Sequence, residues 1–293
     1  MIVSSTTDVL AKRFGIDKAV DMLIEAGYTG IDFSMFDINA LPFTDDYKEV
    51  AARIRAKADA AGVKFVQAHA PFGGSPERVE RELIPIFPRA MEFCSLLGIP
   101  NIVIHPVHFG KYNADHEARY EYNMKMYRDL VPYAKQYGVK IAIENMWTRH
   151  PITGRIVDAV CEDPAELCRY YDDLKDTGCF TICLDVGHVA LCNREPEDVI
   201  RFIGGDRLGC VHLHDVNYVE DNHTLPGVGR INWDRVCRAL ADVNYKGPFN
   251  LEADYFFNGF LLEHSAIATK FMCDASKIFA AKVEEYKAEK CLI

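Results

Sequence analysis

The sequence predicts an α/β protein, a single (β/α)8 TIM barrel formed by residues 1–293 as one domain. Three observations predict this fold. Eight short apolar runs alternate with longer amphipathic stretches along the whole chain. The connections between them are short, which leaves no room for a linker between domains. Polar residues close successive apolar runs about every 37 residues, so that eight such units account for the chain. An open doubly wound sheet is the alternative, but it requires a glycine-rich GxGxxG turn, and the sequence has none.

The eight apolar runs have the character of buried parallel strands. Each run is short, is apolar on both faces and is rich in valine or isoleucine, as expected for strands covered by helices. The predicted strands lie at residues 1–6, 30–35, 64–70, 101–106, 140–146, 181–187, 209–215 and 249–254.

The stretches between these runs have helical patterns with recognisable ends. Glycines mark the ends of three of them, as is common for helices: Gly27 is the last residue of one, and Gly62 and Gly98 directly follow two others. Asp163 followed by Pro164 is typical of a helix start. The predicted helices lie at residues 17–27, 44–61, 77–97, 116–137, 163–174, 195–203, 232–243 and 261–288.

Composition excludes several classes of protein. Apolar residues make up 49% of the chain and charged residues 26%, which is ordinary for a globular protein and excludes disorder. The net charge of −10 argues against a nucleic-acid partner. No apolar run approaches the ~20 residues of a membrane span, and the first residues lack a secretory signal. The ten cysteines form no CxxC pair, so we expect reduced thiols in a cytoplasmic protein.

Polar side chains stand at the ends of the predicted strands. In a barrel of parallel strands the carboxyl ends of all strands meet on one face, where active sites lie. Residues that are distant in the sequence therefore become neighbours there. The strand-end residues are Asp32, His69, His105, Glu144, Asp185, His212 and Glu252.

Four of these residues are candidate metal ligands, one from each of four consecutive strands: Glu144, Asp185, His212 and Glu252. Carboxylates buried together repel one another, and a divalent cation compensates their charge. Asp, Glu and His are suitable ligands for such an ion. We therefore expect one divalent cation as cofactor, with Mn²⁺ preferred and Mg²⁺, Co²⁺ or Zn²⁺ as alternatives.

Other residues at the same face are candidates for contact with a small carbohydrate substrate. Trp147 follows the fifth strand and can form the apolar wall on which a sugar ring packs. The apolar segment 255–262 follows the eighth strand, and we expect it to cover the site or to contact another subunit in a homo-oligomer. The candidate substrate-binding histidines are His69, His105, His188 and His223.

The motifs at the strand ends resemble those of the xylose-isomerase-like TIM barrels. This superfamily includes sugar-phosphate isomerases and epimerases as well as AP endonucleases. The resemblance runs in order from His69 to Glu252 and thus covers most of the chain. It is carried by the motifs HAPFG, VIHP, AIEN, CLDVGH, VHLHD, DNHTLPGVGRINW and NLEAD.

The epimerase branch of this superfamily implies one divalent ion held by the four ligands named above, with His188 in contact with the substrate. Two departures from its pattern stand out. Its strand-seven motif is followed by a substrate-binding arginine, whereas this chain has Asn217 and Tyr218 there. Its GEG tripeptide is replaced by GVG at residues 227–229. These departures argue against a simple ketohexose epimerase.

The endonuclease branch is the alternative implied by the same resemblance. Its members hold three zinc ions with nine residues, and every position has a candidate here: His69, His105, Glu144, Asp185, His188, His212, Asp221, His223 and Glu252. Three features argue against this branch. The net charge is −10, the chain has HLHD where HLND is expected, and the loops lack the basic and intercalating residues that a DNA-bending enzyme needs.

The predicted function is a metal-dependent isomerase or epimerase of sugars or sugar derivatives. The cation would chelate the substrate carbonyl and the adjacent hydroxyl, and loss of the neighbouring proton would give a metal-bound enediolate. Glu144 and Glu252 are the candidate catalytic acid and base, one taking the proton and the other returning it. The same intermediate can expel a leaving group, so a sugar lyase or dehydratase is a further alternative.

Overall fold

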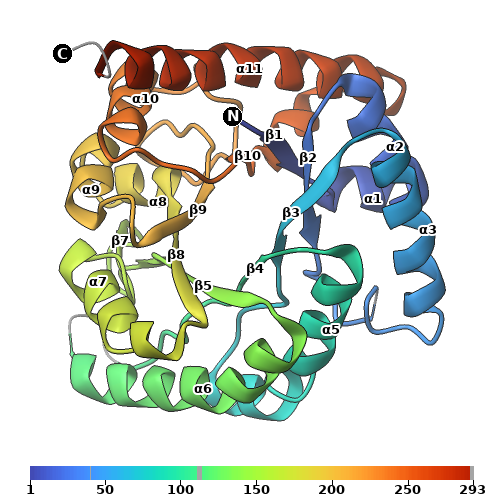
Figure 1. Ribbon diagram of the computed structural model, residues 1–293. Coiled ribbons are helices and arrows are strands. Elements are labelled where there is room, and N and C mark those ends of the chain that lie inside the picture. The colour runs from blue at the N-terminus through green and yellow to red at the C-terminus, as the bar shows by residue number, and fades with distance from the viewer. Residues whose placement is uncertain (40, 111–113, 291–293) are drawn as a thin grey trace.

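Eight parallel strands curl around a central axis in the computed structural model of the protein, and helices surround them (Figure 1). This arrangement confirms the predicted barrel fold. The structure describes residues 1–39, 41–110 and 114–290. The strands of the barrel are β1 (Val3–Thr6), β2 (Gly30–Ser34), β3 (Lys64–His69), β4 (Asn101–Val103), β5 (Lys140–Glu144), β8 (Phe180–Asp185), β9 (Leu208–His212) and β10 (Phe249–Leu251).

The strands pair in the order β10-β1-β2-β3-β4-β5-β8-β9, and every neighbouring pair is parallel. Residue pairing just beyond β9 and β10 closes the ring. Leu213 N–H donates to the Asn250 carbonyl at 2.9 Å, and Glu252 N–H donates to the Leu213 carbonyl at 3.2 Å. This closure brings the end of β10 next to the end of β9.

Helices cover the outside of the barrel, and the long C-terminal helix α11 lies along one edge of the ring beside α10 and α2 (Figure 1). The helical elements are α1 (Asp8–Phe14), α2 (Ile16–Ala26), α3 (Tyr47–Ala60), α4 (Pro76–Arg78), η1 (Val79–Leu83), α5 (Phe87–Leu97), α6 (His116–Tyr137), α7 (Pro164–Asp172), η2 (Lys175–Thr177), α8 (Val186–Leu191), α9 (Pro196–Ile203), α10 (Trp233–Asp242), η3 (Asp254–Gly259), η4 (Leu262–His264) and α11 (Ser265–Lys290).

The structure differs from the sequence prediction in several elements. The helix predicted at 77–97 is interrupted, because Pro85 and Pro88 lack the N–H groups that a continuous helix needs. The last helix begins at Ser265, after two short 3₁₀ turns. Two short helices, α1 and α8, and a two-stranded antiparallel hairpin after β5 were not predicted. The hairpin consists of β6 (Trp147–Arg149) and β7 (Ile156–Asp158).

Asp32 lies within β2 and faces the barrel interior instead of closing the strand. It accepts hydrogen bonds from the side-chain amides of Asn250 at 2.7 Å and Gln67 at 3.1 Å. Ser4 donates to Asn250 at 2.7 Å and extends this network. These hydrogen bonds place Asp32 in a polar network inside the barrel. Burial there raises the pKa of its carboxyl group.

Small apolar side chains fill the barrel directly below the strand ends. Ala142, Cys183 and Cys210 are fully buried and pack together with Val103. Alternate residues of a strand point to the same side, so Glu144, Asp185 and His212 lie above these three residues, respectively. These small apolar residues thus form a buried layer directly beneath Glu144, Asp185 and His212.

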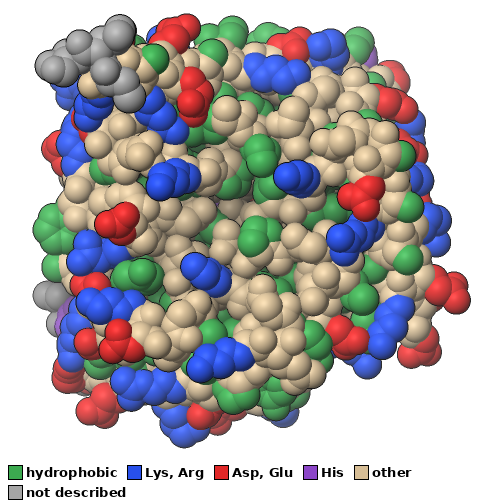
Figure 2. All heavy atoms as spheres, viewed as in Figure 1, with side chains coloured by type: hydrophobic (Ala, Val, Ile, Leu, Met, Phe, Trp, Pro, Cys, Tyr) green, Lys and Arg blue, Asp and Glu red, His purple; other side chains and the backbone are tan. Residues whose placement is uncertain are grey.

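The surface of the molecule is mixed in charge. Figure 2 shows the face viewed in Figure 1, with lysine, arginine and acidic side chains around it and histidine only at its margin. Among the described residues, no helix combines the length and apolar character needed to cross a membrane.

Candidate metal centre and active site

The ends of four neighbouring strands bring together the four predicted metal ligands. Each offers one ligand atom, and these atoms all lie within 4.8 Å of one another: Glu144, Asp185, His212 and Glu252. His212 Nδ1 lies 3.0 Å from Glu144 Oε1 and 2.9 Å from Glu252 Oε2. All four side chains are buried. Three carboxylates and one imidazole at these distances form a donor set that suits a divalent cation.

Two predicted substrate-binding histidines lie against the same glutamate. His105 Nε2 is 2.9 Å from Glu144 Oε2 and 2.8 Å from His69 Nε2, and His69 Nε2 is 3.6 Å from Glu144 Oε2. The ligand atoms of these three residues also lie within 4.8 Å of one another. Glu144 thus belongs to two groups of potential ligands and joins them through its two oxygens.

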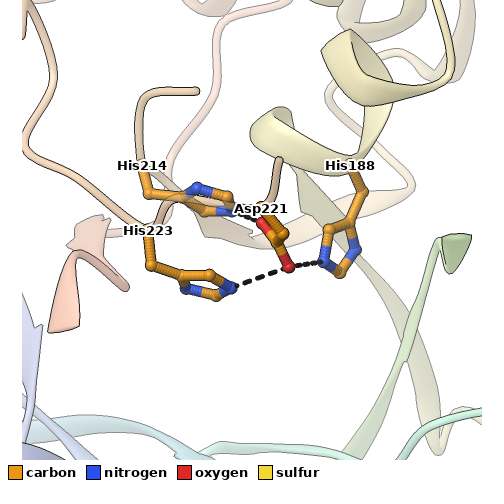
Figure 3. A group of neighbouring side chains, drawn as sticks. All are labelled: His188, His214, Asp221 and His223. Atoms are coloured by element: carbon orange, nitrogen blue, oxygen red, sulfur yellow. Dashed lines mark hydrogen bonds and ion pairs between the residues drawn. The ribbon is translucent and has the colours of Figure 1, made fainter. Parts of the chain in front are cut away.

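A third group lies beside the first (Figure 3) and contains His188, His214, Asp221 and His223. Asp221 Oδ2 is 3.1 Å from His223 Nε2 and 3.7 Å from His188 Nε2. The imidazole of His214 stacks on that of His223, with the ring centres 4.1 Å apart. His214 Nε2 also lies 3.0 Å from Asp185 Oδ1, which connects the third group to the first.

Backbone carbonyls fix the orientation of three of the histidine rings. Nδ1 of His69, His188 and His223 lies 2.8 Å from the carbonyl oxygen of Ala70, Asn145 and Glu252, respectively. A carbonyl accepts only, so each Nδ1 must carry the proton and donate it. Each ring therefore presents Nε2 to its group, which is the arrangement found in metal-binding histidines.

The charges of the site stabilise one another. Burial opposes ionisation of Glu144, but His212 and His105 outweigh it and hold the pKa of the carboxyl well below its usual value. Burial likewise opposes ionisation of Glu252, and His212 lowers its pKa to about 2. Burial disfavours the charged form of His223, but Asp221 raises its pKa to about 10. A bound cation would give the carboxylates the same compensation that these imidazoles give.

Asn145 and Gly187 determine how the backbone and the neighbouring side chains pack around Asp185. The Asn145 side chain accepts from Asp185 N–H at 2.8 Å and donates to the Asp185 carbonyl at 3.0 Å, which ties the end of β5 to the end of β8. Asp185 Oδ1 then accepts from His188 N–H at 2.7 Å and caps α8. A Cβ at Gly187 would lie 2.0 Å from the His214 ring, so only glycine fits there.

Glu162 contacts the Asn145 side chain and is fully buried. Its Oε2 accepts from the Asn145 side chain at 3.0 Å, and its Oε1 lies 3.7 Å from an Arg194 nitrogen. Burial raises the pKa of Glu162 to about 8, against an ordinary value of 4.5. The folded protein therefore binds this proton more tightly than the unfolded chain does. The stability that results is present below pH 4.5 and is lost as the pH rises through 8.

We expect Glu162→Gln to stabilise the protein at pH 8.5 relative to the original chain and to have little effect at pH 5. The difference in the free energy of unfolding should reach on the order of 2–4 kcal/mol, because the variant avoids ionising a buried carboxyl. Urea unfolding at the two pH values measures it. The exposed Glu263→Gln is the matched control. A difference that is the same at both pH values would show that ionisation of Glu162 is not its cause.

The hairpin after β5 places Trp147 at the edge of the site. Trp147 Nε1–H donates to Asp221 Oδ2 at 3.0 Å, so the indole lies against the third group. Arg149 of the same strand packs over the Trp147 ring and pairs with Glu220 at 2.7 Å. In the loop after β3, the ring of Phe72 lies 5.1 Å from that of His69. The predicted apolar wall thus has aromatic residues from two separate loops.

The sequence profile of the xylose isomerase-like TIM barrel family matches residues 20–260. The chain belongs to this family. In this xylose isomerase-like barrel the motifs AIEN, LDVGH and HLHD each end a strand and place their polar residues in the site. The family resemblance found from the motifs is therefore confirmed.

Relatives of this xylose isomerase-like barrel include two different kinds of protein. The D-psicose 3-epimerase of Enterocloster bolteae is 25% identical over 238 residues, which are 76% of this chain and 73% of the relative. A probable endonuclease 4 of Methanoculleus marisnigri is 26% identical over 237 residues, which are 75% of this chain and 81% of the relative. The crystal structure of a D-tagatose 3-epimerase-like protein superposes with a TM-score of 0.76 at 20% identity, covering 99% of this chain and 100% of that protein.

Asp221 and His214 belong to the third group, although neither is among the predicted metal ligands or substrate-binding residues of the sugar enzyme. The sequence places Asp221 beside His223 in the loop after the seventh strand, and His214 on the same side as His212 if that strand continues. His214 stands two residues after His212 in the HLHD motif, and this spacing on a strand was the available signal. The structure places it beside Asp185, although β9 itself ends at His212.

Proposed function

We propose that the protein is a divalent-metal-dependent isomerase or epimerase of sugars or sugar derivatives. The observation that carries this proposal is the buried group of Glu144, Asp185, His212 and Glu252 at the carboxyl ends of neighbouring strands. The likeness to a D-psicose 3-epimerase over three quarters of the chain supports the same reaction class. These four residues would hold the cation, and Mn²⁺ is our preferred ion.

Such a cation, when bound, polarises the substrate carbonyl and makes the neighbouring C–H more acidic. Glu144 and Glu252 approach His212 Nδ1 from two different strands, at 3.0 and 2.9 Å. The carboxyl that is ionised would take the proton from the carbon next to the carbonyl. The other carboxyl, which must carry a proton at that stage, would give it to the opposite face or to the neighbouring carbon, so that the two exchange protonation states in each turnover. His69, His105, His188 and His223 would orient the substrate hydroxyls. Trp147 would limit access of water to the reacting carbon.

A second candidate function is an endonuclease that uses three zinc ions. One observation favours it: the nine residues that the sequence resemblance assigns to such a site all lie in three adjoining groups. Two of these groups share Glu144, and the third contacts the group of Asp185 through His214. The match to a probable endonuclease 4 agrees with it. The net charge of −10 argues against a DNA substrate. We therefore rank this function second.

The metal content of the untagged protein separates the two candidates. We expect about one tightly bound equivalent of manganese, magnesium, cobalt or zinc, because one group combines three carboxylates with full burial. Elemental mass spectrometry measures the content. Removal of the ion with a chelator should abolish deuterium uptake from D₂O at the carbon next to a ketose carbonyl, and adding the ion back should restore it. Nearly three equivalents of zinc together with cleavage of abasic-site DNA would establish the second candidate instead.

A further inference from the structure

A cavity of about 240 Å³ lies beside the candidate metal centre. Three loops, which follow β3, β4 and β5, form its mouth, and η1 and α5 form its base. Its walls are mainly apolar, and the residues that matter most are Phe72, Leu83, Phe87, Val107, Met146 and Trp147. Leu83 and Phe87 are buried in the core, so the base of the cavity is formed by the packed frame of the barrel.

Two residues connect this cavity to the reacting centre. His105 lines the cavity, and its Nε2 is 2.9 Å from Glu144 Oε2. Trp147 lines it as well, and its indole N–H donates to Asp221. The ring of Phe72 lies 4.7 Å from the His105 ring. A substrate held at Glu144 therefore has the cavity directly beside it, within the reach of one substituent.

The side chains that line the cavity determine whether it suits a charged or an apolar substituent of the substrate. Among the described residues that line the cavity there is no lysine, arginine, aspartate or glutamate. The polar side chains are His105 and His108, and burial lowers the pKa of His108, which keeps this imidazole neutral. None of these described lining residues offers a fixed positive charge to balance that of a phosphate or carboxylate group. An alkyl or aryl group would replace water along apolar walls.

The loop after β3 is held in place before any ligand arrives. The Arg78 guanidinium donates to the Gly73 carbonyl at 2.9 Å and to Glu82 at 3.0 Å, so that Arg78 is occupied within its own segment. Gly73 and Gly74 adopt positive φ angles of 86° and 105°, which carry the chain around this turn. The wall that contains Phe72 is thus largely preformed, which lowers the entropy lost on binding.

We propose that this cavity is a subsite for an apolar alkyl or aryl substituent of the substrate. The inference rests on the proposed function, and it narrows the substrate class to sugar derivatives that carry an apolar group, in preference to free or phosphorylated sugars. The polar ring of such a substrate lies at Glu144 and Glu252, and its apolar substituent lies between Phe72, Val107 and Met146.

Isothermal titration of the metal-loaded protein tests the subsite. The probes are the phenyl and methyl 3-oxo-β-glycosides of glucose, galactose and xylose, which keep a ring carbonyl next to a hydroxyl, together with glucose 6-phosphate. For at least one of the three sugars we expect the phenyl glycoside to bind on the order of tenfold more tightly than the methyl glycoside, since a buried phenyl ring removes much more apolar surface from water. No phenyl preference for any of the sugars, or tighter binding of glucose 6-phosphate, would overturn the proposal.

A pair of variants locates the phenyl preference in the cavity. Phe72 lines the cavity and is 41% exposed, so Phe72→Gln should fold, and we expect it to remove most of the preference. Phe202 on α9 is 58% exposed and does not line this cavity, and Phe202→Gln should keep the preference. Equal preference in both variants would place the phenyl group elsewhere and would reject the subsite.

The subsite and the proposed function can fail separately. A phenyl preference that depends on Phe72, combined with no metal-dependent proton exchange in any sugar derivative, would support the subsite and reject the isomerase. Metal-dependent epimerisation of unsubstituted ketoses without any phenyl preference would support the isomerase and reject the subsite.

Discussion

Glu144→Gln is expected to abolish turnover of the true substrate and to weaken binding of the cation. The amide can neither take a proton nor balance a divalent charge, so both roles of Glu144 are lost together. Glu144 also touches two groups of potential ligands, His212 through Oε1 and His105 through Oε2. We expect a loss in kcat on the order of 10³-fold or more. Steady-state kinetics and elemental analysis of the purified variant measure the two effects.

Two further variants make this result interpretable. Glu252→Gln should lose turnover to a similar extent, because it removes the other half of the acid–base pair. Glu197→Gln is the matched control, since Glu197 is a buried glutamate that pairs with Arg235 away from the strand ends. It should keep both activity and metal. Near-full activity of either strand-end variant, with the barrel folded, would disprove the acid–base assignment.

Asp215→Ala is expected to cause the largest loss of stability among single substitutions at the site. Asp215 is fully buried and accepts four hydrogen bonds at 2.7–3.0 Å, three from backbone N–H groups and one from the Trp233 indole. A Cβ at Gly229 would lie 2.3 Å from its Oδ1, which shows how closely the loop wraps around the carboxylate. Alanine leaves these buried donors without a partner. We expect a loss of about 3–5 kcal/mol in the free energy of unfolding.

Urea denaturation measures this loss, and Asp198→Ala on the exposed surface of α9 is the control, with a change within about 0.5 kcal/mol. The loop that Asp215 holds carries Asp221 and His223, so the variant should also weaken the third group of potential ligands. A loss below about 1 kcal/mol would mean that water or a shifted loop replaces the carboxylate.

The strand ends could be predicted from the sequence because the geometry of a parallel barrel is simple. Each buried strand points its carboxyl end to the same face, and so the spacing of Glu144, Asp185 and His212 along the chain was enough to bring them together. The same reasoning failed for Asp32. Its run continues beyond it, and the residue turns into the barrel, where Asn250 and Gln67 bond it.

Features that depend on loops could not be predicted in this way. The hairpin that holds Trp147 and Arg149 has short, half-exposed strands with no clear alternation of apolar residues. The four-donor environment of Asp215 depends on the path of residues 216–233, which no local pattern determines. The cavity beside His105 depends on packing between three loops and the interrupted helix. Each of these features is a tertiary contact, and periodicity contains no information about it.

The carbonyls that orient His69, His188 and His223 are backbone atoms of the barrel frame. Every amino acid supplies such a carbonyl, so a change of side chain at residue 70, 145 or 252 leaves the acceptor in place. The direction in which the three rings point is thus robust to mutation as long as the strands keep their positions. Selection can therefore alter the surrounding loops, and with them the molecules that the site accepts, without first having to rebuild the imidazole array.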